Sequence, residues 1–322
     1  MKVLITGSAG FIGFHLAKVL LAEGFTVHGY DGLTNYYDPV LKNNRHKILM
    51  TNPKFTATIG MLEDEKKLYS TAKEFKPEII IHLAAQAGVR YSLENPRSYI
   101  DSNIIGTFNV MEVARKEKIK HLLMASTSSV YGANVKMPFI EKEKTDSQLT
   151  IYAATKQANE SMAHSYAYLW KIPTTMFRFF TVYGPWGRPD MAYYLFAEAI
   201  SNDRPIKVFN NGEMERDFTY IDDIVKGVTK IIEKSIDKRE HYKIYNIGNN
   251  KTESLQNFIA TIEDAMGKDA IKEMYPMQAG DVPKTFADID KLIDDIDYKP
   301  STSISDGLEK FINWYKKYVN ED

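Results

Sequence analysis

Two side chains suited to acid–base chemistry, Tyr152 and Lys156, stand four positions apart in the chain. On a helix, residues four apart share one face, so this spacing places a phenol beside an ammonium group. A nearby cation favours phenolate over phenol and lowers the pKa of a tyrosine from its usual value of about 10. Such a pair suits general-base removal of a proton from a hydroxyl group. The same spacing occurs at Tyr69 and Lys73, and a solvated helix face would explain either pair, so the neighbouring elements must distinguish them.

The composition restricts the classes of protein open to this chain of 322 residues. The length suffices for one large domain or two unequal ones with a sizeable core. There are 41 basic and 42 acidic residues, which gives a net charge of -1. This balance carries no electrostatic signature of binding to nucleic acid or to an anionic membrane. We therefore predict neither a nucleic-acid partner nor a membrane partner.

Cysteine is absent from the sequence. Its absence excludes disulfides, thiolate metal ligands and a cysteine nucleophile, and it fits a cytoplasmic location. The apolar run at the amino terminus is too short for a signal peptide or a membrane span, and no later segment reaches spanning length. We predict a cytoplasmic protein without a bound metal.

A glycine-rich loop follows the first expected strand, residues 2–6. It contains Gly7, Gly10 and Gly13, and apolar residues then recur with a helical period. A strand, a glycine loop and a helix in this order place a pyrophosphate on the free N–H groups at the start of the helix. A tight turn is the alternative for the glycines alone.

An acidic residue, Asp31, ends the second expected strand at residues 26–30. This is near the distance from the glycine loop at which an acid bonds the adenosine ribose of a dinucleotide. Residues 32–34 offer no arginine or lysine for a 2′-phosphate, so we predict NAD as the cofactor in preference to NADP.

Four hydroxyl residues, 126–129, directly follow another expected strand at residues 120–125. Side chains at the carboxyl end of a strand in a doubly wound sheet lie where ligands bind. Tyr152 follows this strand after one loop and begins the next helix, whereas Tyr69 precedes a strand on an outer helix. This context favours Tyr152, although a helix-capping role would also explain Thr127.

The spacing Gly-x-x-Gly-x-x-Gly, with the later Thr127, Tyr152 and Lys156, resembles the short-chain dehydrogenase/reductase superfamily. The chain is similar to the extended branch, which includes nucleotide-sugar epimerases and dehydratases, over essentially its whole length. The resemblance implies an α/β fold, a doubly wound parallel (Rossmann) sheet with a smaller mixed α/β cap domain at the C-terminus.

Glycines and prolines after residue 183 suggest a boundary between these two domains. Residues 1–180 are expected to form the NAD-binding Rossmann domain and residues 181–322 the substrate-binding cap. A strand at residues 242–248 is expected to rejoin the main sheet.

The family resemblance also implies roles for individual residues. Tyr152 would be the base, Lys156 would hold the nicotinamide ribose, and Thr127 would bond the reacting oxygen. Met61 departs from the family, which usually carries an acid there to bond the adenine, and Glu63 or Asp64 would have to substitute for it. The NAD-binding set that the resemblance implies is Gly7, Gly10, Phe11, Ile12, Gly13, Asp31, Leu62, Leu83, Ala84, Ala85, Gln86, Asn103, Tyr152 and Lys156.

The reaction depends on the positions occupied here by Ser128 and Ser129. Dehydratases of the family carry Asp-Glu there, because elimination of water needs a second acid and base. The related decarboxylases carry Ser-Glu there. Two hydroxyls without a carboxylate leave return of the hydride to the opposite face of the ketone, which is 4-epimerisation of a UDP-sugar.

The hydroxyl run and residues 179–191 look like those of uronic-acid epimerases. This implies conversion of UDP-glucuronate to UDP-galacturonate through a transient 4-keto intermediate. Oxidation at carbon 4 makes a β-keto acid, and our hypothesis is that Ser128, Ser129 and Thr181 hold its carboxylate away from the geometry for loss of carbon dioxide. The substrate-binding residues implied are Ser128, Ser129, Thr181, Arg188, Arg216 and Asp281. A hairpin salt bridge at Arg216, an aspartate turn at Asp281 and backbone capping by the hydroxyls remain alternatives.

Other functions remain open: a UDP-glucose or UDP-N-acetylhexosamine 4-epimerase, a UDP-glucuronate decarboxylase, or a non-catalytic NAD-binding sensor. The resemblance further implies a homodimer, with a helical seam that would include Val110, Val113, Ala158 and Met162.

Overall fold

The computed structural model describes residues 1–234 and 241–320 and divides into two compact units. The first unit contains Met1–Val135, Glu141–Phe179 and the described part of Val228–Asn246. The second contains Lys136–Ile140, Phe180–Gly227 and the described residues from Ile247 onward.

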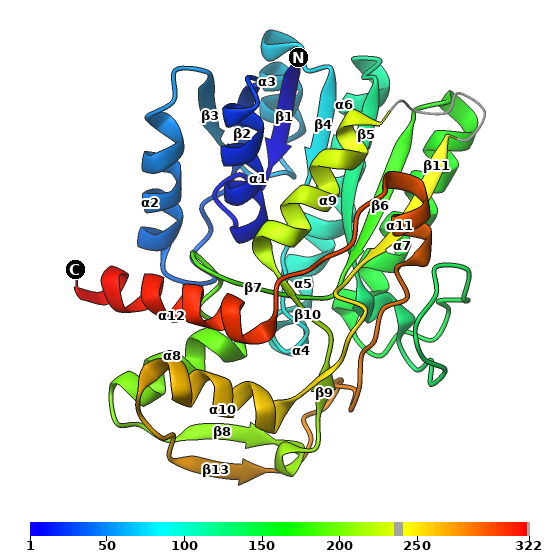
Figure 1. Ribbon diagram of the computed structural model, residues 1–322. Coiled ribbons are helices and arrows are strands. Elements are labelled where there is room, and N and C mark those ends of the chain that lie inside the picture. The colour runs from blue at the N-terminus through cyan, green and yellow to red at the C-terminus, as the bar shows by residue number, and fades with distance from the viewer. Residues whose placement is uncertain (235–240, 321–322) are drawn as a thin grey trace. The chain divides into compact units, whose positions relative to one another are not determined.

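A seven-stranded sheet forms the centre of the first unit (Figure 1). Its order is β11-β6-β5-β4-β1-β2-β3, and the pairings among β1 to β6 are parallel. Strands buried on both faces read as continuous apolar runs, as in the sequence IIIH of β4. Chain order reverses between β1 and β4, which is the topological switch point where ligands bind in such sheets. The strands are β1 (Lys2–Thr6), β2 (Thr26–Asp31), β3 (Phe55–Ile59), β4 (Ile79–His82), β5 (His121–Thr127), β6 (Thr174–Phe179) and β11 (Tyr242–Ile247).

Helices cover both faces of this sheet. In Figure 1, α1 and α2 lie on one face, and α3, α6 and α7 lie on the other. A short helical series precedes α6, and α9 begins in the second unit and ends in the first. The bounds are α1 (Phe11–Ala22), α2 (Pro39–Met50), α3 (Glu65–Phe75), α4 (Tyr91–Glu94), α5 (Pro96–Tyr99), the π-helix η1 (Ile100–Gly106), α6 (Thr107–Lys116), the 3₁₀-helix η2 (Ser128–Tyr131), α7 (Ile151–Trp170) and α9 (Ile221–Glu233).

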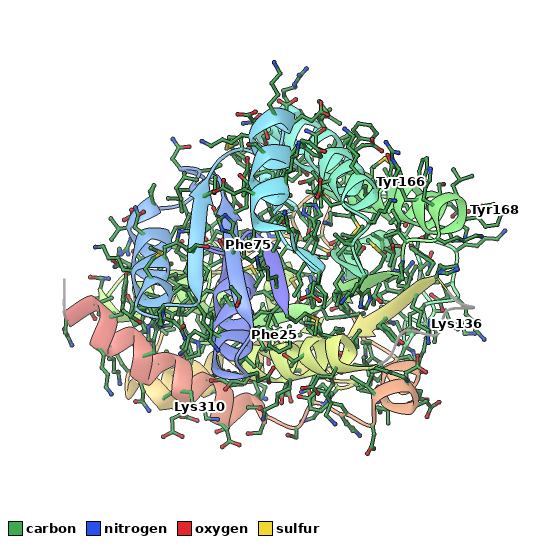
Figure 2. All side chains as sticks on the ribbon, turned by 90° about the horizontal axis from the view of Figure 1, so that it is seen from above. Phe25, Phe75, Lys136, Tyr166, Tyr168 and Lys310 are labelled. Atoms are coloured by element: carbon green, nitrogen blue, oxygen red, sulfur yellow. The ribbon has the colours of Figure 1, made fainter. Side chains whose placement is uncertain are left out.

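The core between the sheet and α3, α6 and α7 corrects one prediction. Val110 and Val113 pack in this core and are at most 2% exposed, and Met162 packs against it. Val110 and Val113 stabilise the fold of one chain, so the prediction that they line a dimer seam is wrong. Ala158 and Met162 are half-buried, and their place in a seam stays a prediction. Two tyrosines of α7 differ in their surroundings. Tyr168 lies at the outer edge in Figure 2, whereas the Tyr166 hydroxyl donates to α6 over 2.8 Å.

The second unit is a smaller mixed α/β assembly. Short strands pair as β7 with β10, β8 with β13, and β9 with β12. Its interior is aromatic: Phe218 stacks on Phe258 with ring centroids 4.1 Å apart. The elements are β7 (Thr181–Tyr183), α8 (Ala192–Ser201), β8 (Ile206–Phe209), the 3₁₀-helix η3 (Asn210–Gly212), β9 (Glu215–Arg216), β10 (Phe218–Tyr220), β12 (Glu253–Ser254), α10 (Leu255–Met266), β13 (Lys272–Tyr275), α11 (Asp290–Ile296) and α12 (Ile304–Asn320).

The predicted fold class, a doubly wound parallel sheet with a smaller mixed α/β part, is confirmed. The long stretch of the first unit ends at Phe179, and β11 lies beside β6 in the main sheet. The assignment of cofactor and substrate binding to the two domains stays a prediction. None of the helices in the ranges that the structure describes is long and apolar enough to cross a membrane.

Candidate active site

The glycine loop lies at the switch point of the sheet. Gly7 adopts φ +77°, and a Cβ atom there would be 2.7 Å from the backbone nitrogen of Ala84. A Cβ at Gly13 would be 2.1 Å from the Gly7 carbonyl oxygen. The structure thus brings the loop between β1 and α1 against the segment that follows β4. The N-cap of α1 is Gly10, which has no side chain to cap the helix. The start of the helix therefore stays open to an anion.

Asp31 holds this loop from the end of β2. One of its carboxylate oxygens accepts from the backbone N–H of Ala9 and the other from that of Leu33, each over 2.9 Å. A carboxylate offers about four lone-pair sites, so these bonds leave acceptor capacity for ribose hydroxyls. The adjoining predicted residues Phe11 and Ile12 begin α1, with Phe11 buried.

The segment after β4 is fastened to the helices behind it. Asn103, in the π-helix η1, accepts from the backbone N–H of Gln86 over 2.8 Å and donates to the Gln86 carbonyl over 3.0 Å. It also donates to the Thr155 hydroxyl over 3.1 Å. Asn103 is fully buried, and its side-chain hydrogen bonds hold the backbone of Gln86 in place. The predicted residues Leu83, Ala84 and Ala85 lie half-buried just before Gln86.

Helix α7 carries the predicted catalytic pair. The Thr150 hydroxyl caps it by accepting from the Ala153 N–H over 3.2 Å. Tyr152 is half-buried, and its ring meets that of Tyr99 edge-on with centroids 6.0 Å apart. Lys156, one turn further, is 2% exposed. A cap, a packed ring and a buried ammonium fix the first two turns of this helix.

Burial shapes the charges around Lys156. It lowers the pKa of Lys156 to about 8, and the Glu160 carboxylate opposes that shift. Burial, with a smaller effect of Lys156, lowers the pKa of His82 to about 3. His82 is therefore neutral near pH 7 and bonds Thr6 over 2.7 Å and Thr107 over 2.9 Å through its two ring nitrogens.

The hydroxyl run after β5 turns into η2. The Thr127 hydroxyl caps this turn, accepting from the Ser129 N–H over 3.2 Å and donating to the Ser129 hydroxyl over 3.3 Å. Thr127 therefore does cap this turn, as the alternative for it supposed. The proton of the Thr127 hydroxyl can turn to another acceptor. Ser128 and Ser129 are half-buried. The Ser126 hydroxyl instead donates to Glu160 of α7.

Met61 occupies the position where an adenine-bonding acid was expected. Its side chain is 38% exposed, and its sulfur would be 2.5 Å from a Cβ added at Gly32. Glu63 and Asp64 follow on the exposed surface, and Asp64 caps α3. Leu62 is buried, and its carbonyl accepts from Asn109 over 2.9 Å.

Four of the predicted substrate-binding residues lie in the second unit. Arg216 donates to the Asp281 carboxylate over 2.7 Å, so two residues 65 positions apart form one ion pair. Arg188 forms an ion pair with Asp190. Thr181 begins β7, with its N–H bonded to the Asp217 carbonyl over 3.1 Å. A salt bridge, the alternative for Arg216, is present, and its carboxylate comes from Asp281, which was predicted separately as a substrate-binding residue.

Sequence reasoning missed His82 and the pair Glu160–Arg178. Glu160 had a readable signal, because it stands four residues after Lys156 as Lys156 stands four after Tyr152. His82 had none beyond its place at the end of an apolar strand. Within the described residues, no group of three or more His, Asp or Glu side chains is placed to hold a metal ion.

Known proteins resemble this chain in sequence over nearly its whole length. The model of the NAD dependent epimerase/dehydratase family matches residues 3–248. A probable UDP-glucuronate 4-epimerase of Rhizobium meliloti (strain 1021) is 51% identical, covering 98% of this chain and 97% of its own. UDP-glucuronate 4-epimerase 4 of Arabidopsis thaliana is 42% identical, covering 100% of this chain and 77% of its own.

Among solved structures, UDP-glucuronic acid 4-epimerase from Bacillus cereus, in complex with UDP-glucuronic acid and NAD, is similar throughout. It has a TM-score of 0.92 and 33% sequence identity, covering 99% of this chain and 100% of that one. The chain belongs to the NAD dependent epimerase/dehydratase family.

Proposed function

We propose that this chain is an NAD-dependent UDP-glucuronate 4-epimerase, an isomerase that interconverts UDP-glucuronate and UDP-galacturonate through a transient 4-keto sugar. The observation that carries the proposal is the pair of Tyr152 and a buried Lys156 on α7, in a unit where the strand β5 leads into hydroxyls without a carboxylate. The UDP-glucuronate 4-epimerases among its relatives support a uronic-acid substrate.

The residues around the glycine loop fit NAD. The loop leaves no room for a Cβ at Gly13, as close approach of backbone to a pyrophosphate requires, and Asp31 supplies acceptors for a ribose. We propose that NAD is held by the predicted set Gly7, Gly10, Phe11, Ile12, Gly13, Asp31, Leu62, Leu83, Ala84, Ala85, Gln86, Asn103, Tyr152 and Lys156. When bound, NAD supplies a reversible hydride acceptor for sugar carbon 4.

The side chains of the first unit would move the proton. Tyr152, as phenolate, takes the proton from the hydroxyl on carbon 4 and gives it back after the sugar has presented its other face. The Lys156 ammonium favours the phenolate and bonds the nicotinamide ribose. Thr127, whose proton can turn away from Ser129, donates to the reacting oxygen. Epimerisation needs no carboxylate at positions 128 and 129, and serine occupies both.

The remaining predicted residues would bind the substrate. We propose that Ser128 and Ser129 donate to the sugar carboxylate, with Thr181 in the same role. Arg188, Arg216 and Asp281 keep their proposed contacts with the nucleotide sugar. An arginine already paired with a carboxylate is held in a defined rotamer, so binding would cost it less side-chain entropy.

Proton NMR of UDP-glucuronate incubated with the pure protein and NAD tests the function directly. The expected result is a new set of sugar signals from UDP-galacturonate, with UDP-glucose unchanged in a parallel sample. Release of UDP-pentose would identify a decarboxylase, conversion of UDP-glucose a neutral-sugar epimerase, and no conversion of any sugar a non-catalytic protein.

The carboxylate role of the hydroxyls needs a second experiment. The double variant Ser128→Ala/Ser129→Ala is expected to form UDP-pentose as a side product, because the carboxylate can then turn perpendicular to the ketone. Ser165→Ala, an exposed hydroxyl on α7, is the matched control. Slower but clean epimerisation by the double variant would refute this role.

We also propose that the protein is a homodimer. Ile105 and Phe108, on η1 and α6, are 39% and 45% exposed and form an apolar surface that a second copy would cover. Light scattering should give twice the chain mass for the wild type and the single mass for Phe108→Glu. The control is Val135→Glu, at a residue 90% exposed, which should stay dimeric. The cytoplasmic location stays a prediction.

A further inference from the structure

A buried ion pair lies on the same helix as the catalytic pair. Glu160 of α7 accepts from Arg178 of β6 twice, over 2.9 Å from Nε and over 2.7 Å from Nη2. Each side chain is 3% exposed. The Ser126 hydroxyl, from the last residues of β5, donates to the same carboxylate.

The surroundings of this cluster hold it in one arrangement. The Arg178 guanidinium lies over the Tyr131 ring, 4.8 Å from its centroid, and the Tyr131 hydroxyl donates to Asn246 over 2.7 Å. The Tyr242 hydroxyl donates to the backbone carbonyl of Glu160 over 3.0 Å. The carboxylate is therefore tied to β5 and β6, and the backbone of Glu160 is tied to β11.

The position of Glu160 on α7 relates this cluster to the catalytic residues. Tyr152, Lys156 and Glu160 stand at intervals of four, so they share one face of the helix. A carboxylate one turn beyond a buried ammonium favours the charged, protonated form of that ammonium. A replacement of a buried ion pair by apolar residues is often neutral for stability, so the presence of this pair calls for a reason other than stability.

We propose that Glu160 is a positioning residue for the proposed reaction: its carboxylate, fixed by Arg178 and Ser126, keeps Lys156 protonated beside Tyr152. This inference rests on the proposed function. Arg178 and Ser126 act through Glu160, because they set the place of the carboxylate.

The other charges near Lys156 support this role. His82 of β4 is neutral near pH 7, so it neither stabilises nor repels the ammonium strongly. Tyr152 lies on the side of Lys156 opposite to Glu160 along α7. Burial alone would remove the proton from a lysine near neutral pH, and Glu160 is the carboxylate whose charge opposes this for Lys156.

The test is a direct titration of Lys156 in the full chain. Protein labelled with carbon-13 lysine is titrated by NMR, without added nucleotide and then with saturating NAD, and the Lys156 Cε signal is assigned by its loss in Lys156→Met. The double variant Glu160→Gln/Arg178→Met removes both buried charges together. Its titration midpoint is expected to be lower by about one pH unit in both states, and the alkaline limb of kcat to move by a similar amount.

Matched variants separate this role from packing. Glu160→Asp keeps a carboxylate and is expected to retain most of the wild-type midpoint. Glu112→Gln removes the carboxylate of an arginine pair on α6 and is expected to leave the midpoint unchanged. If the double variant does not fold, Glu160→Gln alone replaces it, and a larger lowering of the Lys156 midpoint is expected because the Arg178 charge is then left unpaired.

The outcomes are decisive. An unchanged Lys156 midpoint in a folded variant would overturn the proposal, and so would failure of both variants to fold, because the pair would then be structural. A wild type that converts no UDP-sugar would refute the proposed function instead. The NMR titration does not depend on turnover, so the two failures are distinguishable.

Discussion

Replacing Gly13 by alanine should disable cofactor binding through geometry alone. The added Cβ would be 2.1 Å from the Gly7 carbonyl oxygen and 2.9 Å from the Gly7 carbonyl carbon. Both atoms belong to the backbone, so no side-chain rotation relieves the clash. The loop must move by about 1 Å to restore an ordinary contact. That movement also disturbs the bond from the Gly10 N–H to the Gly7 carbonyl, which is 3.0 Å long.

The magnitude follows from the bonds that such a shift removes. A hydrogen bond from a backbone N–H to a charged phosphate contributes about 1.5 to 3 kcal/mol. Loss of two such bonds weakens NAD binding by at least about 100-fold, and overpacking lowers the free energy of unfolding by about 1 to 3 kcal/mol. Isothermal titration with NAD measures the first quantity, and thermal unfolding without nucleotide measures the second.

Gly227→Ala is the matched control. Gly227 lies inside α9, where an added Cβ would meet the Tyr298 ring at an ordinary 3.5 Å, and alanine in a helix is more favourable than glycine by about 0.5 to 1 kcal/mol. The control should therefore bind NAD like the wild type. A dissociation constant of Gly13→Ala within about threefold of the wild type, in a folded protein, would refute the placement of the pyrophosphate at this loop. If Gly13→Ala does not fold, Gly10→Ala, with its Cβ 2.9 Å from the Gly7 oxygen, decides by the same criterion.

Three further predictions concern the catalytic residues and the adenine end. Tyr152→Phe should lower kcat by about 100-fold or more while NAD affinity stays near the wild type, and Tyr69→Phe should leave both unchanged; equal effects would refute the choice of Tyr152. Met61→Asp should tighten NAD binding about fivefold in a fluorescence titration, because a carboxylate accepts from the adenine amino group; weaker or equal binding would place the adenine elsewhere. Because the pKa of Lys156 is lowered to about 8, kcat should fall as the pH rises through that value, and Lys156→Arg should remove this decline, since arginine keeps its charge.

Local patterns were enough to predict where several candidate residues lie within their own elements. The glycine loop, Asp31 at the end of β2 and the pair on α7 each belong to one element and the turn beside it. Their spacing is set by the periods of strand and helix. The structure places them as those periods require.

Contacts between distant segments could not be predicted in the same way. Arg216 and Asp281 were proposed independently, and their ion pair depends on how β9 meets a loop 65 residues later. Val110 and Val113 show the same limit, because a helical apolar stripe does not reveal whether it faces the chain's own sheet or a second copy. In this structure it faces the sheet.

The two tyrosine–lysine pairs show what spacing leaves undetermined. Tyr69 and Lys73 share a face of α3 just as Tyr152 and Lys156 share one of α7. Lys73 is exposed, whereas Lys156 is 2% exposed. The interaction of two charges weakens in proportion to the dielectric constant around them, so a hydrated ammonium perturbs a nearby phenol far less than a buried one. The burial of Lys156, beside Glu160 of α7 and the neutral His82 of β4, is therefore what distinguishes this pair from a common helical spacing and supports the proposal that it holds a phenolate.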